Sequence, residues 1–180
     1  MVGINKLDLK SLIGNYKDFP KKGVMFRDVN PLFRNWRATQ EISKEFIKKN
    51  ESQEIDLIAG IESRGFTVAS LLAGNFSKGI VLLRKAGKLP GDTIRKNYEI
   101  EYGNAMIEIQ RDAVKEGQNI LIADDLIATG GTAAAAAELI EDIGGKIFGF
   151  AFIIELSYLG GADKLRGKGY EVRSLVKYDE

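Results

Sequence analysis

Short apolar runs alternate with helical stretches along most of this chain, and this alternation limits the possible folds more than any other feature of the sequence. Four runs are short and rich in Ile, Val and Phe, as strands buried on both faces of a sheet are. These runs are Ile55–Ile61, Gly79–Leu83, Asn119–Ala123 and Ile147–Ile154. Three stretches have helical composition, and they are Arg37–Lys49, Gly65–Phe76 and Thr132–Ile143. The alternation predicts one α/β domain over residues 1–180, with a parallel sheet flanked by helices.

A different pattern occupies residues 85–111. Two short segments of alternating polarity, Tyr98–Ile100 and Ala105–Ile109, are accompanied by several glycines and by Pro90. Such segments predict a hairpin that leaves the sheet, with Gly103-Asn104 as a candidate turn. We therefore expect a flexible loop and a hairpin within residues 85–111.

The composition excludes several classes of function. The sequence has no Cys and no His, so it offers no disulfide, no thiolate and no histidine as a general base or zinc ligand. Its 26 Lys and Arg residues balance 25 Asp and Glu residues, which gives no general attraction to nucleic acid or to anionic lipid. No apolar run approaches the ~20 residues of a membrane span, and the first residues do not resemble a secretory signal. We expect a soluble cytoplasmic protein without a nucleic-acid or membrane partner.

The most informative stretch is 119–133, where an apolar run is followed by two adjacent carboxylates, a glycine turn and a helix. Because ligands of open α/β sheets bind at the carboxyl ends of the strands, Asp124 and Asp125 are expected at a site. Adjacent carboxylates repel each other unless a ligand or cation uses them, and the hydroxyls of a ribose match their acceptor oxygens. The turn Thr129–Thr132 offers glycines, hydroxyls and the free N–H groups of a helix N-terminus, which suit a phosphate monoester.

This stretch lacks the spacing of a Walker P-loop and of a dinucleotide-binding turn. In a purely structural alternative the aspartates cap the helix and the glycines only turn the chain, but the joint occurrence of all four parts favours a ligand site. The combination resembles the ribose-phosphate signature of the type I phosphoribosyltransferases. The resemblance implies that the ribose and its 5′-phosphate are bound by Asp124, Asp125, Ala128, Thr129, Gly130, Gly131 and Thr132.

Three further stretches resemble one branch of that family, the adenine phosphoribosyltransferases, in the family's order and at its spacings. They are Phe19–Asp28, Gly60–Phe66, and Arg84–Gly91 continuing to Glu101–Gly103. With a shorter match at Glu155-Leu156, the resemblance extends to nearly the whole chain. It implies the type I phosphoribosyltransferase fold, with an N-terminal base-binding hood over residues 1–35.

The resemblance also implies a diphosphate site. Glu62-Ser63-Arg64 follows a predicted strand and opens a predicted helix, so its main-chain N–H groups and the Arg64 guanidinium can hold a diphosphate. In the family this loop often contains a cis peptide bond, which would join Glu62 and Ser63. Arg84 and Lys88 are implied as counter-charges for the leaving diphosphate, and Arg84 as a residue that can reach a neighbouring subunit. Without the resemblance, ordinary solvated basic side chains would explain the same residues.

Glu101 matches the catalytic-loop carboxylate of the family, and Tyr102 follows it in the same loop. The implied role of Glu101 is a hydrogen bond to the N7 side of adenine while N9 attacks the ribose. The segment from Lys85 to Tyr102 would close over the site and exclude water. An exposed strand residue is the alternative reading of Glu101.

The adenine site is implied at Met25, Phe26, Arg27 and Leu156. Phe26 is expected to stack on the purine, and the main chain of Met25 and Arg27 to select the base. For Leu156 a place in the hydrophobic core is the stronger expectation.

The resemblance implies transfer of the 5-phosphoribosyl group from 5-phospho-α-D-ribose 1-diphosphate to adenine, which gives AMP and diphosphate in purine salvage. It also implies Mg²⁺ held mainly by substrate and water, and a homodimer. Two alternatives stay open. One is a transferase for another purine base, although relatives of that kind usually carry a base-contacting lysine. The other is a non-catalytic ligand-sensing regulator of the same fold, although this chain has neither the length for an added module nor a basic excess.

Overall fold

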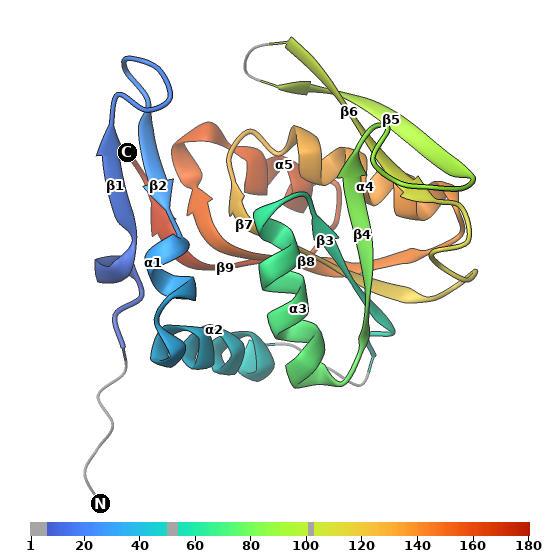
Figure 1. The fold of residues 1–180 in the computed structure, drawn as a ribbon, viewed down its shortest axis with the longest axis horizontal. Helices are drawn as coiled ribbons and strands as arrows, with labels where there is room; N and C mark the ends of the chain where they lie inside the picture. Colours follow the sequence, from blue (N-terminus) through green and yellow to red (C-terminus); the bar gives the residue numbers. More distant parts are fainter. Residues whose placement is uncertain (1–6, 50–53, 101–102) are drawn as a thin grey trace, which may run out of the picture.

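The computed structural model describes residues 7–49, 54–100 and 103–180. Its centre is a seven-stranded sheet with the strand order β5-β6-β4-β3-β7-β8-β9 (Figure 1). Five neighbouring strands are parallel, and they are β4 (Gly79–Lys85), β3 (Leu57–Ile61), β7 (Asn119–Ile127), β8 (Lys146–Leu156) and β9 (Val172–Tyr178). The predicted α/β class with a parallel sheet is therefore confirmed.

Helices cover both faces of this sheet. α3 (Arg64–Phe76) contacts β3 and β7, α2 (Trp36–Lys49) packs on α3, and α4 (Gly131–Asp142) contacts β7 and β8. The core consists of two clusters, one containing Leu121 with residues of α3 and the other containing Ile122 with residues of α4. Because successive strand residues point to opposite faces, α3 and α4 lie on opposite faces of the sheet. No helix in the described ranges is long and apolar enough to cross a membrane.

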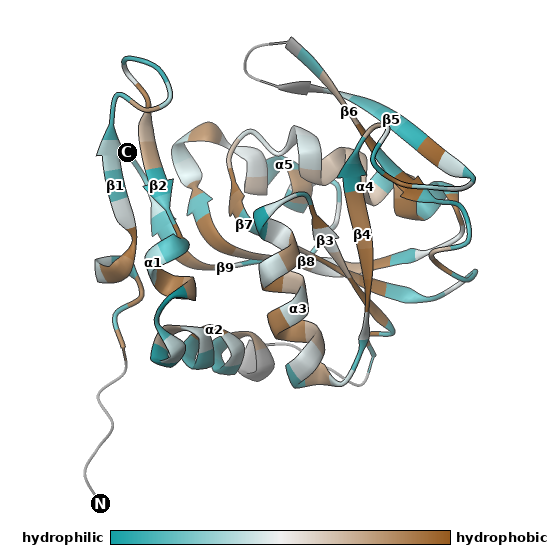
Figure 2. Ribbon diagram, in the orientation of Figure 1, coloured by the Kyte–Doolittle hydropathy of each residue, from teal (hydrophilic) through white to brown (hydrophobic). Residues whose placement is uncertain are grey.

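The alanine run explains how α4 packs. Ala135, Ala136 and Ala137 are all buried, and alanine combines the highest helix propensity with a side chain small enough for close contact with the sheet. Figure 2 shows that β4 is hydrophobic along most of its length and hydrophilic at its carboxyl end. The hydrophilic end of β4 lies at the edge of the sheet where β3 and β7 also end.

The order of the strands creates a switch point between β3 and β7. The chain leaves β3 through α3 to reach β4 on one side, and leaves β7 through α4 to reach β8 on the other. Gly60 of β3 pairs with Ala123 of β7, so the segments that follow these two residues emerge side by side. Ligands of open α/β sheets bind at such a switch point.

The N-terminal segment forms a separate small layer. It contains η1 (Lys10–Leu12), the antiparallel strands β1 (Gly14–Lys17) and β2 (Met25–Asp28), and α1 (Asn30–Phe33). In Figure 1 this layer stands beside β9, near the C-terminus. The Tyr178 ring joins the two parts, because the Arg27 guanidinium carbon lies 3.9 Å and the Lys10 Nζ 4.6 Å from its centroid.

The hairpin lies at the other edge of the sheet, next to β4. Its strands β5 (Thr93–Ile100) and β6 (Gly103–Gln110) are antiparallel and longer than predicted. The candidate turn was wrong, since Gly103 and Asn104 lie in β6 and pair with Ile100 and Glu99. β5 is also bound to α4, where Lys96 Nζ lies 3.1 Å from Asp142 Oδ2.

Several elements were not predicted, among them the short elements of the N-terminal layer and three near the C-terminus. α5 (Gly161–Gly167) is only seven residues long, and η2 (Ser157–Leu159) precedes it. β9 was missed because its sequence mixes Val with Arg, Ser and Lys, a pattern typical of an edge strand that is only partly covered.

Candidate active site

The acidic doublet lies inside β7, two residues before the strand ends at Ile127. This differs from the expected position after the strand, because Leu126 and Ile127 still pair with Ile154 and Glu155 of β8. Asp125 is 4% exposed. Its Oδ2 lies 2.8 Å from Arg64 Nε at the start of α3. The neighbouring strands β3 and β7 therefore bring a guanidinium and a carboxylate together.

The two carboxylates have unusual electrostatics. Burial raises the pKa of Asp124 well above its ordinary value, and the neighbouring charge of Asp125 raises it further. Burial also raises the pKa of Asp125, while the Arg64 guanidinium acts in the opposite direction. Asp124 therefore carries its charge at a cost, which is typical of a group that interacts with a ligand.

A cavity of about 110 Å³ lies next to Asp124. Its lining includes Asp124, Leu126, Ile127, Ala128, Thr129, Gly130, Gly131, Thr132, Ala133 and Phe152. All five residues predicted to hold the 5′-phosphate thus line one cavity together with the first aspartate. The cavity lies at the N-terminus of α4, where the first N–H groups have no partner within the helix and the helix dipole favours an anion. A larger recess of about 520 Å³, between Leu7–Lys10, Glu45 and Leu175–Lys177, contains none of the predicted site residues.

Gly161 supports the turn Ala128–Thr132, the candidate phosphate loop, from the opposite side. Its N–H donates to Ala128 O at 3.1 Å. A Cβ at this position would lie 2.2 Å from Ala128 O and 2.5 Å from Gly130 N, so the approach requires glycine. The sequence reading did not identify this residue, and the Gly160-Gly161 doublet was the only signal.

The turn after β3 also lies against the doublet. The peptide bond between Glu62 and Ser63 is cis, in agreement with the expectation drawn from the resemblance. A Cβ on Gly65 would lie 2.8 Å from Ala123 O and from Asp124 Oδ1. The β3–α3 turn and β7 are therefore in direct contact, and glycine permits that contact.

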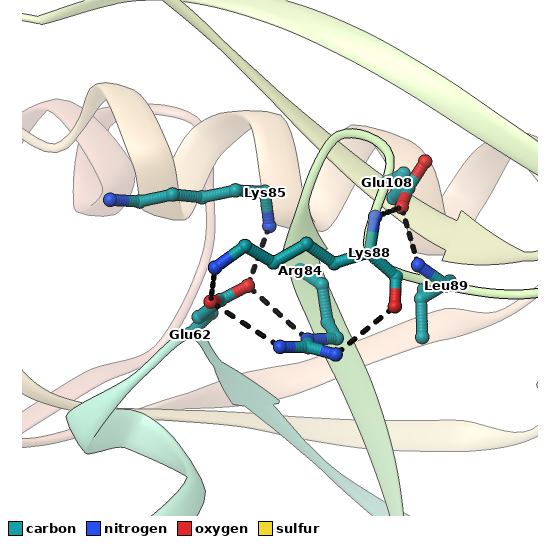
Figure 3. Close-up of polar contacts among 6 residues, drawn as sticks. All are labelled: Glu62, Arg84, Lys85, Lys88, Leu89 and Glu108. Atoms are coloured by element: carbon teal, nitrogen blue, oxygen red, sulfur yellow. Dashed lines mark hydrogen bonds and ion pairs between the residues drawn. The ribbon is translucent and has the colours of Figure 1, made fainter.

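Glu62 binds two of the predicted diphosphate-binding side chains, Arg84 and Lys88 (Figure 3). Its Oε1 lies 2.8 Å from Lys88 Nζ, and its Oε2 lies 3.3 Å from Arg84 Nε and accepts the N–H of Lys85 at 2.9 Å. Although burial alone would raise the pKa of Glu62, these hydrogen bonds lower it to about 2. The structure thus brings Arg84 and Lys88 together, each paired with this carboxylate.

The hood brings Phe26 to the same place. The Arg64 guanidinium carbon lies 5.3 Å from the centroid of the Phe26 ring, and the Phe19 ring meets Phe26 edge-on at 5.1 Å. The Arg27 side chain points away, toward Tyr178, so only its main chain is free to face a base. Leu156 is buried within the core cluster. Glu101 and Tyr102 lie outside the described residues.

The sequence assigned no role to two carboxylates that the structure buries. Glu155 accepts hydrogen bonds from Arg166 and Ser174, and it immediately precedes Leu156 at the end of β8. Glu108 of β6 is fully buried and accepts hydrogen bonds from Lys88, Leu89 and Arg95. Nothing in the sequence distinguishes Glu108 from the solvent-facing glutamates usual in alternating strands.

Comparisons with known proteins decide the family. A family model described as the phosphoribosyl transferase domain matches residues 29–177. The adenine phosphoribosyltransferase of Nitrosopumilus maritimus is 53% identical over 172 residues, which cover 96% of this chain and 100% of that protein. The chain belongs to the adenine phosphoribosyltransferase family. The predicted family, its fold and its enzymatic character are confirmed together.

Solved structures of adenine phosphoribosyltransferases agree with this assignment. The enzyme from Thermoanaerobacter pseudethanolicus has a TM-score of 0.90 and 43% identity, and the match covers 94% of this chain and 98% of that one. The enzyme from Saccharomyces cerevisiae, complexed with adenine and an imino-altritol bisphosphate, has a TM-score of 0.87 and 41% identity, with 93% and 96% coverage. Both alternatives from the sequence lose support, since these relatives share the adenine-specific name and nearly the full length.

Proposed function

We propose that this chain transfers the 5-phosphoribosyl group of 5-phospho-α-D-ribose 1-diphosphate to adenine, giving AMP and diphosphate in purine salvage. The observation that carries the proposal is the position of Arg64, which contacts Asp125 on one side and the Phe26 ring on the other. One side chain thus joins the proposed ribose, diphosphate and base sites. A single domain over residues 1–180, with the hood over 1–35 and the loop and hairpin over 85–111, would contain every part that this reaction needs.

The donor would be held at two ends. The 5′-phosphate would occupy the cavity at Ala128–Thr132, and the ribose hydroxyls would donate to Asp124 and Asp125. Binding at both ends would fix the reacting carbon between them.

The diphosphate would lie against the turn Glu62-Ser63-Arg64, with Arg84 and Lys88 as further cations. Arg64, Arg84 and Lys88 each pair with a carboxylate in this structure. Because a diphosphate carries more charge than a carboxylate, it would draw these cations away from Asp125 and Glu62. The acids would then stabilise the basic side chains whenever the diphosphate has left.

Adenine would stack on Phe26 and form hydrogen bonds with the main chain of Met25 and Arg27. Leu156 would contribute packing below the base. Glu101 would receive or donate the proton at N7 as N9 attacks, and a positioned acid or base of this kind contributes ~10²- to 10⁴-fold. Tyr102, in the same loop, would help to close the site against water.

Mg²⁺ is proposed to enter with the donor. The described residues contain no group of three or more acidic side chains that could hold a metal ion. The ligands of the ion would come mainly from substrate oxygens and water. Asp124 and Asp125 are the protein carboxylates that would face it. The ion would supply positive charge at the departing diphosphate.

The direct test is adenine-dependent release of diphosphate from the donor. Guanine, hypoxanthine and xanthine serve as competing bases in the same assay. We expect release with adenine, and AMP as the product. Equal release with another base would contradict the adenine specificity, and binding of the donor without release would favour a regulator.

We further propose a cytoplasmic homodimer that uses the uncovered face of β4. Ile80 and Leu82 are 44% and 37% exposed, and Met106 of β6 is 38% exposed. Ile80, Leu82 and Arg84 alternate along β4 and therefore share one face. A partner subunit on this apolar face would lie beside Arg84. This agrees with the resemblance, which implies that Arg84 can reach the site of a neighbouring subunit.

A Leu82→Glu variant is expected to convert the dimer to a monomer, because a charge would have to be buried in the apolar contact. Light scattering after gel filtration measures the mass directly. Trp36→Glu is the matched control, since Trp36 is a more exposed apolar residue at the start of α2. A dimer that survives Leu82→Glu, or one that Trp36→Glu also dissociates, would show that β4 is not the interface.

A further inference from the structure

We propose that Glu108 is a positioning residue for the donor, which holds the main chain at Lys88 and Leu89 while the Lys88 side chain moves between Glu62 and the diphosphate. The inference rests on the proposed function and adds a residue to it that no motif of the sequence contains.

The first observation is the burial of Glu108 and the identity of its partners. The side chain is fully buried, and a buried carboxylate is tolerated only where hydrogen bonds replace water. Its Oε1 accepts the N–H of Lys88 at 2.7 Å and the N–H of Leu89 at 2.8 Å. Its Oε2 accepts from Arg95 Nε at 2.9 Å. One oxygen therefore serves the loop and the other serves the neighbouring strand β5.

The second observation is that Lys88 is held on both sides of its main chain. Its N–H donates to Glu108 Oε1, and its carbonyl oxygen accepts from Arg84 Nη1 at 3.0 Å (Figure 3). Its side chain is 49% exposed and reaches Glu62. The contacts with Glu108 do not depend on where Lys88 Nζ or the Arg84 guanidinium points, so both cations can leave Glu62 while Glu108 still holds the main chain of the loop.

The third observation is that Glu108 stays charged. Burial would raise its pKa, but hydrogen bonds from the main chain of residues 87–89 and from Arg95 lower the pKa to about 2. Hydrogen bonds to an ionised acceptor are stronger than those to a neutral one. The lowered pKa therefore favours the ionised form of Glu108 at neutral pH.

A fixed main chain matters because of what binding would otherwise cost. A loop that is mobile before binding must be ordered when the ligand arrives, and this lowers the affinity. Holding residues 88 and 89 in advance leaves only one flexible side chain to be ordered. The effect should fall on the donor, because Lys88 is assigned to the diphosphate and the base contacts lie on the hood.

The test compares Glu108→Ala with Glu108→Gln by steady-state kinetics. Glu108→Ala is expected to raise KM for the donor about tenfold or more, since it removes two charge-assisted hydrogen bonds from the loop. KM for adenine should change less than about twofold. Glu108→Gln keeps one acceptor oxygen and should restore most of the donor KM. Arg95→Ala, at a side chain that is 51% exposed, tests the loss of the other partner and should leave KM near the wild-type value.

A double-mutant cycle with Lys88→Ala separates positioning from general stability. If Glu108 acts through Lys88, then Glu108→Ala should raise the donor KM much less in the Lys88→Ala background than in the wild type. Independent, multiplying effects would overturn the proposal. If Glu108→Ala does not fold, the same cycle is run with Glu108→Leu, which fills the buried space but has no acceptor oxygen, with the same criterion. Asp92→Asn is the control for the loop, because the Asp92–Arg111 pair is exposed and its loss should change neither KM.

The two proposals fail in different ways. Calorimetry with inorganic diphosphate measures the site directly, and we expect weaker binding by Glu108→Ala. A wild-type chain without adenine-dependent turnover would contradict the proposed function. A turning-over wild type whose Glu108→Ala variant binds donor and diphosphate normally would contradict only the positioning role.

Discussion

An Asp124→Asn variant is expected to unfold at a higher temperature than the wild-type chain at neutral pH, and to lose roughly 10- to 100-fold in kcat/KM for the donor. The loss follows from the proposed ribose contact, because a hydrogen bond to a charged group contributes ~1.5–3 kcal/mol and each ~1.4 kcal/mol is a factor of ten. Thermal denaturation followed by circular dichroism and steady-state kinetics measure the two effects. The variant thus separates the effect of Asp124 on the stability of the fold from its contribution to the reaction.

The gain in stability follows from the sign of the pKa shift. Burial and the Asp125 charge raise the pKa of Asp124 in the folded state, whereas the unfolded pKa is ~3.9. Such a group favours folding below its unfolded pKa, and this contribution is lost as the pH rises through the folded pKa. At neutral pH the charged Asp124 carboxylate therefore lowers the free energy of unfolding, and asparagine removes this destabilisation. The difference in melting temperature should shrink toward about pH 4, where the wild-type carboxyl is protonated in the folded state.

Asp125→Asn is the matched control. Asp125 is more deeply buried than Asp124 and is paired with Arg64 at 2.8 Å, so removal of its charge also leaves Arg64 without this partner. We expect a smaller stabilisation than for Asp124→Asn, or a loss. An Asp124→Asn variant that melts at or below the wild-type temperature at neutral pH would show that the doublet carries no electrostatic cost.

The sequence could predict which residues meet at the site, because parallel strands deliver their carboxyl ends to one edge of a sheet. Glu62, Arg64 and Asp124 belong to two separate motifs, and the order of β3 and β7 in the sheet makes those motifs neighbours. The sequence could not predict that Arg64 pairs with Asp125 and Lys88 with Glu62. Partner choice depends on a few ångströms between side chains, which periodicity and spacing do not encode.

Two of the residues to which the sequence assigned no role share a physical property. Glu108 and Gly161 act on the main chain of distant loops, Glu108 through hydrogen bonds to Lys88 and Leu89 and Gly161 through close packing against Ala128. Their partners lie about 20 and 33 residues away, so no local motif includes both members of a pair. The Gly103-Asn104 turn failed for a related reason, since strand pairing extended through both residues and tertiary contacts override a weak turn signal.

The phosphate loop gives the other large expected effect. A Gly161→Ala variant is expected to lose roughly 100-fold or more in kcat/KM for the donor, because the loop would have to move away from its position. Its Cβ would lie 2.2 Å from Ala128 O and 2.7 Å from Thr129 C, and these are main-chain atoms that cannot rotate aside. Loss of two hydrogen bonds to a charged phosphate, at ~1.5–3 kcal/mol each, accounts for a change of that size.

Gly167→Ala is the control at the other end of α5. A Cβ at Gly167 would have no heavy atom within 4 Å, and alanine favours a helix more than glycine does. This variant should keep full activity and equal or exceed the wild type in melting temperature. Direct binding of AMP, followed by calorimetry, should be weakened by Gly161→Ala and unchanged by Gly167→Ala. If both variants bind AMP and turn over donor equally well, then the contact between α5 and the phosphate loop does not set the position of the loop, and the cavity at Ala128–Thr132 needs another explanation.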